Sequence, residues 1–382
     1  MTSEDVRRAV SAVVDPELRR PIGELDMVRE VTVDGDTARV AIALTIVGCP
    51  AADRIEREVR DAAASVAGIR DVEVQVGVMT PAQRTALTER LRGPGRTMPF
   101  GPDSLTRVIA VTSGKGGVGK STVTANLAVA LADRGLAVGL IDADVHGFSI
   151  PALLGLIEDD GLPPQPTRVG ELMLPPVAYG VKAISIGMFL PRDAPSAGAV
   201  AWRGPMLHRT VSQFLTDVFF GDLDVLLIDM PPGTGDVAIS VGQLLPHADV
   251  LVVTTPQSAA SDVAVRSGLV ARQTGQRVIG VVENMAALTL PDGTTLDLFG
   301  SGGGEAVARA LSESDAGRDA VTVPLLGSVP LSPGLRAGGD TGTPIVATHP
   351  DDPAAQALTA IAAQLASRPR GLAGRSLPVA PA

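Results

Sequence analysis

The sequence predicts an α/β protein in which a large domain with a parallel β-sheet follows a smaller α+β domain. Five near-continuous apolar runs occur after residue 106, and stretches with helical periodicity lie between most of them. Strands that are buried on both faces of a parallel sheet have this composition. A glycine-rich stretch, residues 114–121, separates the first apolar run from the first helical stretch. Before residue 93 the segments are shorter, and several alternate apolar with polar residues, as half-buried strands do.

The elements of the smaller domain follow from local spacing. Thr2 and Asp5 are spaced as in a capping box, ahead of an apolar-periodic stretch that reaches Val13. Residues 28–46 alternate on both sides of Asp34-Gly35, which indicates a β-hairpin. The remaining elements predicted in this domain are a helix with Ile55, Val59, Ala62 and Val66 on one face, a strand at 71–78 and a short helix at 81–92.

The domain boundaries are predicted from composition. Residues 93–102, GPGRTMPFGP, are dense in glycine and proline and show no periodicity, so we expect a linker there. The residues after Arg368 lack a core pattern and are expected to be disordered. The expected organisation is a small α+β domain at 1–92, a linker at 93–105, a larger domain at 106–368 and a disordered tail at 369–382.

The larger domain is predicted to alternate strands with helices. Its expected strands are residues 107–112, 137–142, 225–229, 250–255 and 277–284, and its expected helices include 120–134, 206–219 and 258–274. In an open sheet of parallel strands, ligands bind beyond the carboxyl ends of the strands. Functional side chains are therefore expected where these apolar runs end.

Charge and composition disfavour several classes of function. The chain has 32 basic and 42 acidic residues, a net charge of −10, and only 2% aromatic residues, which disfavours a nucleic-acid surface. No apolar run approaches the roughly 18–20 residues that cross a bilayer, and acids at positions 4 and 5 argue against a signal peptide. The single cysteine, Cys49, fits a reducing compartment. We expect a cytoplasmic protein without nucleic-acid or membrane partners.

The stretch GKGGVGKS at 114–121 has the sequence of a phosphate-binding P-loop, and it lies between a strand and a helix as a P-loop requires. Its glycines let backbone N–H groups turn toward phosphate oxygens, and the helix N-terminus adds a favourable dipole. Lys120 is expected to reach the β- and γ-phosphates, and the Ser121 hydroxyl to take a Mg²⁺ position.

A second lysine, Lys115, lies five positions before Lys120, where it cannot easily reach the same phosphates without displacing Lys120. The pattern resembles the deviant-P-loop ATPases, the class that includes MinD, ParA and the nitrogenase reductase. The resemblance implies that Lys115 reaches the nucleotide of a partner subunit, so that a homodimer encloses two ATP molecules. Such a cation delivered in trans neutralises charge on the transferred phosphoryl group. The alternative is that Lys115 is a solvated loop charge.

Other motifs of the larger domain extend the predicted site. Asp142 and Asp144 follow one strand, and Asp229 ends another at a Walker B position. The resemblance implies that Asp144 orients the attacking water and that Asn284 reads the adenine edge, although Asn284 could also be a turn residue. The predicted catalytic residues are Lys115, Lys120, Asp144 and Asp229. The predicted nucleotide contacts are Gly114, Lys115, Gly116, Gly117, Val118, Gly119, Lys120, Ser121, Thr122 and Asn284. The predicted Mg²⁺ residues, direct or through water, are Ser121, Asp142 and Asp229.

Longer stretches of sequence indicate which group within this class of ATPases the chain resembles. DADVHGFSIP, WRGPML, DVLLIDMPPGTGD and FGSGGGE together resemble the Mrp/ApbC group of iron–sulfur cluster carrier ATPases. DPELRRPIGELDMV and LTIVGCPAAD at the N-terminus resemble the small iron–sulfur assembly domain of the SufT type. The resemblance implies a slow, dimeric MgATPase that switches with its nucleotide and delivers iron–sulfur clusters to apo client proteins.

One position departs from that group. Many members carry a Cys-x-x-Cys pair before FGSGGGE, with which two subunits bridge one cluster, whereas this chain has Leu290 and Gly293 there. Neither side chain supplies a thiolate, so the usual bridging site cannot form. Cys49 remains a candidate ligand, since it precedes a predicted helix whose N-terminus would lower the pKa of a thiol; alternatively it is a small residue in a turn. Two other functions stay open: a positioning ATPase like MinD or ParA, and a family member that kept the ATPase but lost cluster binding.

Overall fold

The computed structural model describes residues 2–46, 51–92, 98–144, 147–190, 204–290, 292–313 and 322–368. The chain divides into two compact units. Unit 1 comprises residues 1–97 together with 166–177 and 216–221, and unit 2 comprises residues 98–165, 178–215 and 222–382. The predicted tail at 369–382 lies outside the described residues.

Unit 1 has the elements that the sequence predicted. Thr2 and Asp5 form the reciprocal hydrogen bonds of a capping box at the start of helix α1 (Ser3–Ser11). Strands β1 (Val28–Asp34) and β2 (Thr37–Leu44) form the hairpin, and β3 (Asp71–Val78) pairs parallel with β2. Helices α2 (Ala52–Ala64) and α3 (Pro81–Arg92) complete the expected order. The buried face of α2 contains Ala63 rather than the predicted Ala62, because the helix presents Ile55, Val59 and Ala63 to the sheet.

A short hairpin from the middle of the chain also belongs to unit 1. Strands β6 (Thr167–Val169) and β7 (Leu172–Leu174) pair antiparallel, and Val169 and Leu174 are buried in the hydrophobic core of this unit. The Thr88 hydroxyl donates a hydrogen bond to the Val169 carbonyl at 3.0 Å. The sequence predicted each domain as one continuous stretch of chain. Residues 166–177, which lie within the predicted larger domain, instead cluster with unit 1, about 80 residues from Thr88.

Unit 2 is built on an eight-stranded sheet in the order β15-β12-β11-β4-β10-β5-β9-β8. The strands are β4 (Arg107–Ser113), β5 (Val138–Asp142), β8 (Val177–Ala178), β9 (Val181–Ser185), β10 (Val225–Asp229), β11 (Asp249–Thr254), β12 (Arg277–Ala286) and β15 (Leu325–Pro330). From β15 to β9, every neighbouring pair is parallel. The five predicted strands are present, and β9 and β15 extend the parallel sheet on its two sides.

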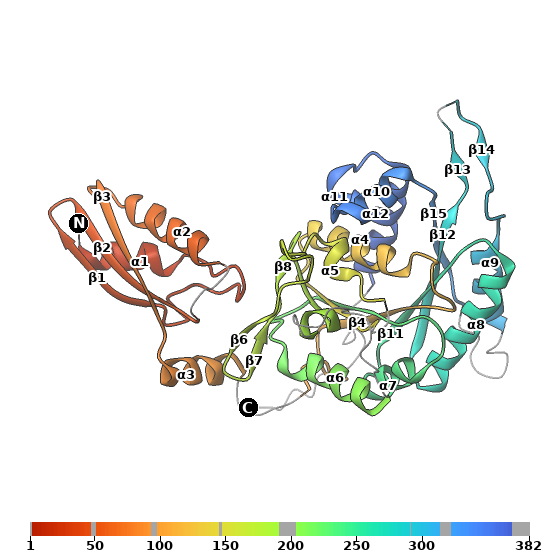
Figure 1. Ribbon diagram of the computed structural model, residues 1–382, viewed down its shortest axis with the longest axis horizontal. Coiled ribbons are helices and arrows are strands. Elements are labelled where there is room, and N and C mark those ends of the chain that lie inside the picture. Colours follow the sequence, from red (N-terminus) through yellow and green to blue (C-terminus); the bar gives the residue numbers. More distant parts are fainter. Residues whose placement is uncertain are drawn as a thin grey trace, which may run out of the picture. The chain divides into compact units, whose positions relative to one another are not determined.

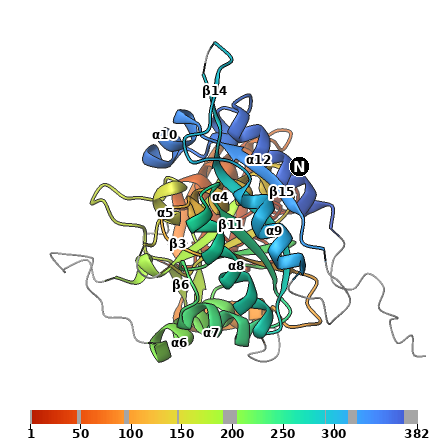
Figure 2. The same ribbon diagram turned by 90° about the vertical axis from the view of Figure 1, so that its right-hand side faces the viewer.

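Helices cover both faces of this sheet (Figures 1 and 2). One face carries α4 (Lys120–Asp133), α5 (Ile150–Leu153), α10 (Pro333–Thr341), α11 (Ile345–Thr348) and α12 (Pro353–Ala366). The other carries α6 (Gly204–Asp217), α7 (Asp236–Leu244), α8 (Ser258–Gln273) and α9 (Gly303–Glu313). A 3-10 turn at Ile186–Phe189 follows β9.

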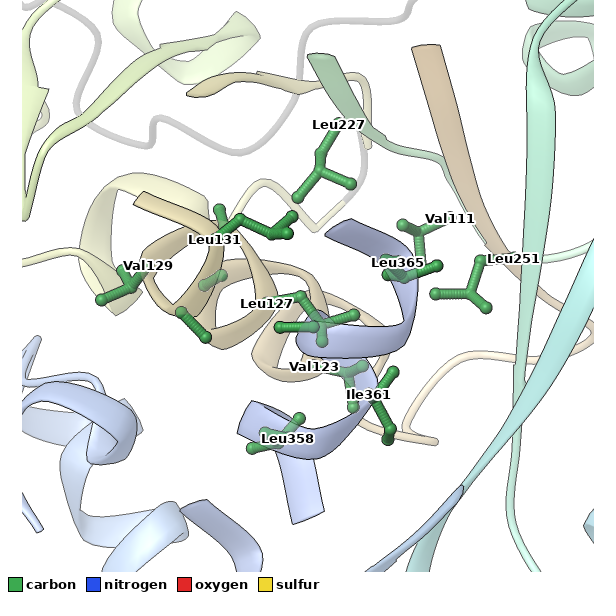
Figure 3. Packing of buried hydrophobic residues seen from close by; sticks show 14 of the residues in the cluster. Val111, Val123, Leu127, Val129, Leu131, Leu227, Leu251, Leu358, Ile361 and Leu365 are labelled. Carbon is green, nitrogen blue, oxygen red and sulfur yellow. The ribbon is translucent and has the colours of Figure 1, made fainter. Parts of the chain in front are cut away.

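The core of unit 2 holds helix α4 in place. Val123 and Leu127 of α4 are fully buried and pack between the sheet and α12, where Leu358, Ile361 and Leu365 lie (Figure 3). A helix that is covered on two sides is apolar around most of its circumference, which α4 is. Truncating one such leucine to alanine costs about 2–5 kcal/mol, so this packing rigidly positions the loop that precedes α4.

A two-stranded ribbon, β13 (Leu288–Thr289) and β14 (Thr295–Leu296), follows β12 and projects beyond the rest of unit 2 (Figures 1 and 2). Among the described residues, no helix combines the length and apolar character that crossing a membrane requires.

Candidate nucleotide and magnesium site

The predicted site residues of unit 2 meet at one edge of its sheet. The P-loop leaves the end of β4, the central strand, and its neighbour β10 ends with Asp229. Strand β5, next to β10, ends with Asp142, and the register places Asp229 directly beside Asp142. Because the strands are parallel, all their carboxyl ends lie at this edge, where ligands bind in open α/β sheets. The topology thus brings together three motifs that are spread over residues 114–229 of the chain.

At two positions of the loop, close packing leaves room only for glycine. A Cβ at Gly114 would lie 2.7 Å from the Val263 carbonyl oxygen of α8, and closer still to the next backbone nitrogen. Gly119 has φ +77°, in the left-handed region, and a Cβ there would meet the Asn284 amide nitrogen. Glycine at both positions therefore allows the loop to approach α8 on one side and the end of β12 on the other.

Lys120 is buried and contacts carboxylates. Its Nζ donates to Asp229 Oδ1 at 2.7 Å and lies 3.9 Å from Asp144 Oδ2. Asp229 also accepts hydrogen bonds from the Ser121 hydroxyl at 2.6 Å and the Thr124 hydroxyl at 3.1 Å. The predicted cation, hydroxyl and Walker B carboxylate thus form one cluster. Lys120 must exchange this partner for phosphate oxygens when it contacts a nucleotide.

Asp142 lies beside Asp229 of this cluster, and both of its carboxylate oxygens already accept hydrogen bonds. It is fully buried and accepts hydrogen bonds from the Asp144 and Ile150 N–H groups and from the Ser185 hydroxyl. Burial raises the pKa of Asp142 to about 8, and the adjacent Asp229 carboxylate acts in the same direction. Burial also raises the pKa of Asp229, although Lys120 opposes that effect. The Mg²⁺ role of Asp142 stays a prediction.

Asp144 and Lys115 have different environments. Asp144 is buried, and its Oδ1 accepts the Gly147 N–H at 3.2 Å. Lys115 is partly exposed, and its Nζ donates to the Gln257 side chain at 3.2 Å, beyond the end of β11. The two lysines of the loop therefore differ: Lys120 is buried beside the carboxylates, whereas Lys115 is held by a neutral side chain.

Asn284 joins the P-loop to a cavity. Its amide donates to the Val118 carbonyl at 2.9 Å, so the side chain supports the loop whatever else it contacts. The adjacent cavity has a volume of about 290 Å³. It is lined by Gly119, Thr122, Leu153, Asn284, Met285, Pro330, Leu331, Ser332, Leu335, Arg336, Gly339 and Asp340. A cavity of this size beside a P-loop suits the base and ribose of a nucleotide.

Comparisons with known proteins identify the family of the chain. The profile described as NUBPL iron-transfer P-loop NTPase, of the ParA group, matches residues 104–366, and that of iron–sulfur cluster assembly proteins matches residues 3–76. The chain is 54% identical over 380 residues to the iron–sulfur cluster carrier protein of Mycobacterium tuberculosis, covering 98% of this chain and 96% of the relative. The chain belongs to the iron–sulfur cluster carrier family of P-loop NTPases. The predicted family and the predicted ATP-hydrolase class are thereby confirmed.

A more distant relative carries the same description, and a solved structure is described as a nucleotide-binding protein. The iron–sulfur cluster carrier protein of Synechocystis is 41% identical over 370 residues, which covers 96% of this chain and 98% of the relative. Among solved structures, a nucleotide-binding protein of Archaeoglobus fulgidus in complex with ADP is 33% identical, with a TM-score of 0.46. The match covers 64% of this chain and 92% of the Archaeoglobus chain.

The site residues fit the cofactor that this ATPase family implies. Mg²⁺ prefers oxygen ligands and binds through one or two carboxylates, water and substrate phosphates. The Ser121 hydroxyl and the Asp229 carboxylate are such donors, and they already lie 2.6 Å apart. Ser121 and Asp229 would hold Mg²⁺, which would supply positive charge that neutralises the phosphate oxygens.

Residues that bear on cluster binding lie elsewhere. Leu290 and Gly293 stand at the turn of the β13–β14 ribbon, where the Leu290 carbonyl accepts the Gly293 N–H at 2.9 Å. Cys49 lies outside the described residues. Within the described ranges, no group of three or more His, Cys, Asp or Glu side chains is arranged to hold a metal ion.

The sequence analysis missed several contributors to the site. Thr124 contacts Asp229 because it lies one helical turn after Lys120, a spacing that is visible in the sequence. Ser185 contacts Asp142 because β9 pairs beside β5, and the segment VKAIS at 181–185, which contains Lys182, offered no distinctive signal. The wall of the cavity formed by β15 and α10 had no comparable signal.

Proposed function

We propose that the protein is a cytoplasmic homodimer that binds MgATP at the P-loop of each subunit and uses hydrolysis to drive iron–sulfur cluster delivery to apo client proteins. The observation that carries the proposal is the contrast between the two lysines: Lys120 lies among the site's carboxylates, and Lys115 lies outside that cluster, on Gln257. Membership of the cluster carrier family supports the substrate class.

In this proposal each side chain has one task. Lys120 leaves Asp229 and binds the β- and γ-phosphates, after which Asp229 and Ser121 face the Mg²⁺ position. Asp144, beside Lys120, orients the attacking water. Asn284 keeps its hydrogen bond to Val118 and presents its carbonyl oxygen to the base. The backbone N–H groups of residues 114–122 surround the phosphates.

Lys115 acts on the partner subunit's nucleotide. A charge supplied in trans at the moment of phosphoryl transfer is worth about 10³–10⁵ in rate in related GTPases. Coupling hydrolysis to dimer geometry lets ATP occupancy set the contact between subunits and lets hydrolysis reset it.

The test compares Lys115→Ala with Lys120→Ala in the full-length protein. Lys120→Ala should lose ATP binding, because the loop loses its cation on the phosphates. Lys115→Ala should bind ATP within a few-fold of wild type, measured by equilibrium dialysis, but hydrolyse it at least about a hundredfold more slowly and fail to dimerise with ATP. Wild-type hydrolysis by a monomeric Lys115→Ala protein would refute the trans role.

A second function is favoured by one observation: Leu290 and Gly293 offer no thiolate. A family member that keeps the ATPase but has lost cluster binding would show neither bound iron nor sulfide after anaerobic reconstitution. The carrier function instead predicts a cluster that depends on Cys49 and is completed by outside ligands, because one cysteine per subunit falls short of four thiolates. Comparing iron and sulfide content between wild type and Cys49→Ala separates the two.

A further inference from the structure

Thr124 is a fully buried polar residue of α4 that has no role in the proposed function. Its hydroxyl donates to the Lys120 carbonyl at 2.8 Å and to Asp229 Oδ1 at 3.1 Å. A hydroxyl has one proton, so these two acceptors share it. The side chain of Thr124 therefore joins the helix that begins with Lys120 to the carboxylate that ends β10.

The Thr124 hydroxyl is held in place by its own helix. In a helix, threonine can direct Oγ1 at the carbonyl four residues back, which restricts its χ1 angle, and the bond to the Lys120 carbonyl is of this kind. The helix is fixed in turn, because the preceding residue, Val123, is fully buried and packs against α12 (Figure 3). The hydroxyl is therefore a fixed donor beside Asp229.

The two carboxylate oxygens of Asp229 have different partners. Oδ1 accepts from the Lys120 Nζ at 2.7 Å and from the Thr124 hydroxyl. Oδ2 accepts from the Ser121 hydroxyl at 2.6 Å. Ser121 and Asp229 are the residues that would hold Mg²⁺, so Oδ2 is the oxygen on the side of that position. Oδ1 is the oxygen through which the helix can set the direction of Oδ2.

The exchange of partners by Lys120 changes the surroundings of Oδ1. When Lys120 moves to the phosphates, Oδ1 loses a cation while Asp229 stays fully buried. A buried carboxylate oxygen without a donor is unfavourable, and a hydrogen bond to an ionised acceptor is stronger than one to a neutral acceptor. The shared Thr124 proton therefore shifts from the Lys120 carbonyl toward Oδ1 at the moment when the carboxylate has to hold its orientation without Lys120.

We propose that Thr124 is a positioning residue for the Mg²⁺ site: its hydroxyl holds Oδ1 of Asp229 while Lys120 leaves, so that Oδ2 stays beside Ser121. The inference rests on the proposed function, in which Lys120 leaves Asp229 and Asp229 faces Mg²⁺. Removing a group that orients a metal-binding carboxylate typically lowers metal affinity or activity by about 10–100-fold. The effect of Thr124 should therefore appear in metal affinity rather than in nucleotide affinity.

The test compares substitutions that remove or keep the Thr124 hydroxyl in the full-length protein. Mn²⁺, which prefers the same oxygen ligands as Mg²⁺, is titrated into the ADP complex and followed by electron paramagnetic resonance. Thr124→Val should raise the Mn²⁺ dissociation constant at least about tenfold. Thr124→Ala also lacks the hydroxyl and favours the helix, so it should give the same shift if the valine is poorly tolerated. Thr124→Ser keeps the donor and should stay within about threefold of wild type. ADP affinity without metal should be equal in all of them.

Thr112→Val is the matched control for the loss of a buried hydroxyl. Thr112 is buried in β4, and its hydroxyl pairs with that of Ser267 at 2.8 Å rather than with a carboxylate. Thermal melts should show similar destabilisation by Thr112→Val and Thr124→Val, since each loses one buried hydrogen bond. The Mn²⁺ dissociation constant of Thr112→Val should stay within about twofold of wild type. An equal shift in Thr112→Val would show general loosening of the core and overturn the proposal.

A double-mutant cycle with Asp229→Asn tests whether Thr124 acts through this carboxylate. Once Asp229 is an amide, adding Thr124→Val should change the Mn²⁺ dissociation constant by less than about twofold, because the hydroxyl has no metal-binding carboxylate left to orient. The same fold-change in both backgrounds would show that Thr124 acts through the Lys120 carbonyl alone, which overturns the proposal.

The outcomes also separate this inference from the proposed function. If Asp229→Asn weakens Mn²⁺ binding and Thr124→Val does not, the positioning role of Thr124 is refuted while the Mg²⁺ role of Asp229 stands. If Asp229→Asn leaves the Mn²⁺ dissociation constant unchanged, the Mg²⁺ role of Asp229 fails, and the role of Thr124 fails with it.

Discussion

The substitution Gly114→Ala tests how closely the P-loop packs on α8. A Cβ at this position would lie 2.7 Å from the Val263 carbonyl oxygen, whereas an ordinary carbon–oxygen contact is about 3.4 Å. The overlap of about 0.7 Å falls on the backbone of a 16-residue helix, which cannot yield as a flexible side chain would. The loop therefore has to move by an amount on the order of 1 Å.

Both stability and ATP binding should respond. Overpacking of this kind costs about 1–3 kcal/mol, which would lower the melting temperature by roughly 2–12 °C in a domain of about 150–250 residues and by less in a larger one. A displacement of about 1 Å in a positioning loop costs up to about a hundredfold in rate, so we also expect ATP affinity to fall at least about tenfold. Thermal melts without nucleotide and titration with a fluorescent ATP analogue measure the two effects.

Gly116→Ala is the matched control in the same loop. A Cβ there has the Pro232 ring as its nearest neighbour, at 3.9 Å, which is ordinary contact. Neither glycine has a positive φ, so alanine suits both backbones and stiffens the unfolded chain equally. If Gly114→Ala has the same melting temperature as Gly116→Ala and binds ATP within twofold of wild type, the close packing of the loop on α8 does not constrain the site.

Three further predictions concern carboxyl groups. Asp229→Asn should keep or improve metal-free ATP binding, because Lys120 loses its competing partner. The same substitution should lower Mg²⁺-dependent hydrolysis at least about a hundredfold, and unchanged turnover would contradict the Walker B role. Asp144→Ala should bind ATP within a few-fold of wild type and accumulate the ATP-bound dimer in gel filtration; normal turnover would remove Asp144 from water orientation. Burial, with repulsion from Asp15, raises the pKa of Glu17 from 4.5 to about 7. The free energy of unfolding should therefore fall by up to ~3 kcal/mol as the pH rises from about 4.5 to about 7, because the folded state favours the protonated carboxyl. Glu17→Gln should flatten this pH dependence in urea titrations, and an unchanged slope would show that Glu17 is not the group responsible.

Local signals predicted much of the fold. The capping box of α1, the hairpin at Gly35 and the helical spacing of Ile55 and Val59 depend on neighbours within a few residues, and each is present. The runs that became β4, β5, β10, β11 and β12 are almost continuously apolar because their strands are buried on both faces. The short strand β9 and the strand β15 lack such distinctive runs, so their places in the sheet depended on pairing with β5 and β12.

By itself the sequence determined the glycine loop with its two lysines, the carboxylates that end the apolar strands, and the absence of thiols at positions 290 and 293. Each of these depends on residue type and short-range spacing. Only the tertiary structure decided that Lys120 contacts Asp229, that Ser185 donates to Asp142 and that residues 166–177 join unit 1. These contacts join residues from 43 to more than 100 positions apart, and strand order and core packing bring such residues together because burying apolar surface is favourable across the whole chain.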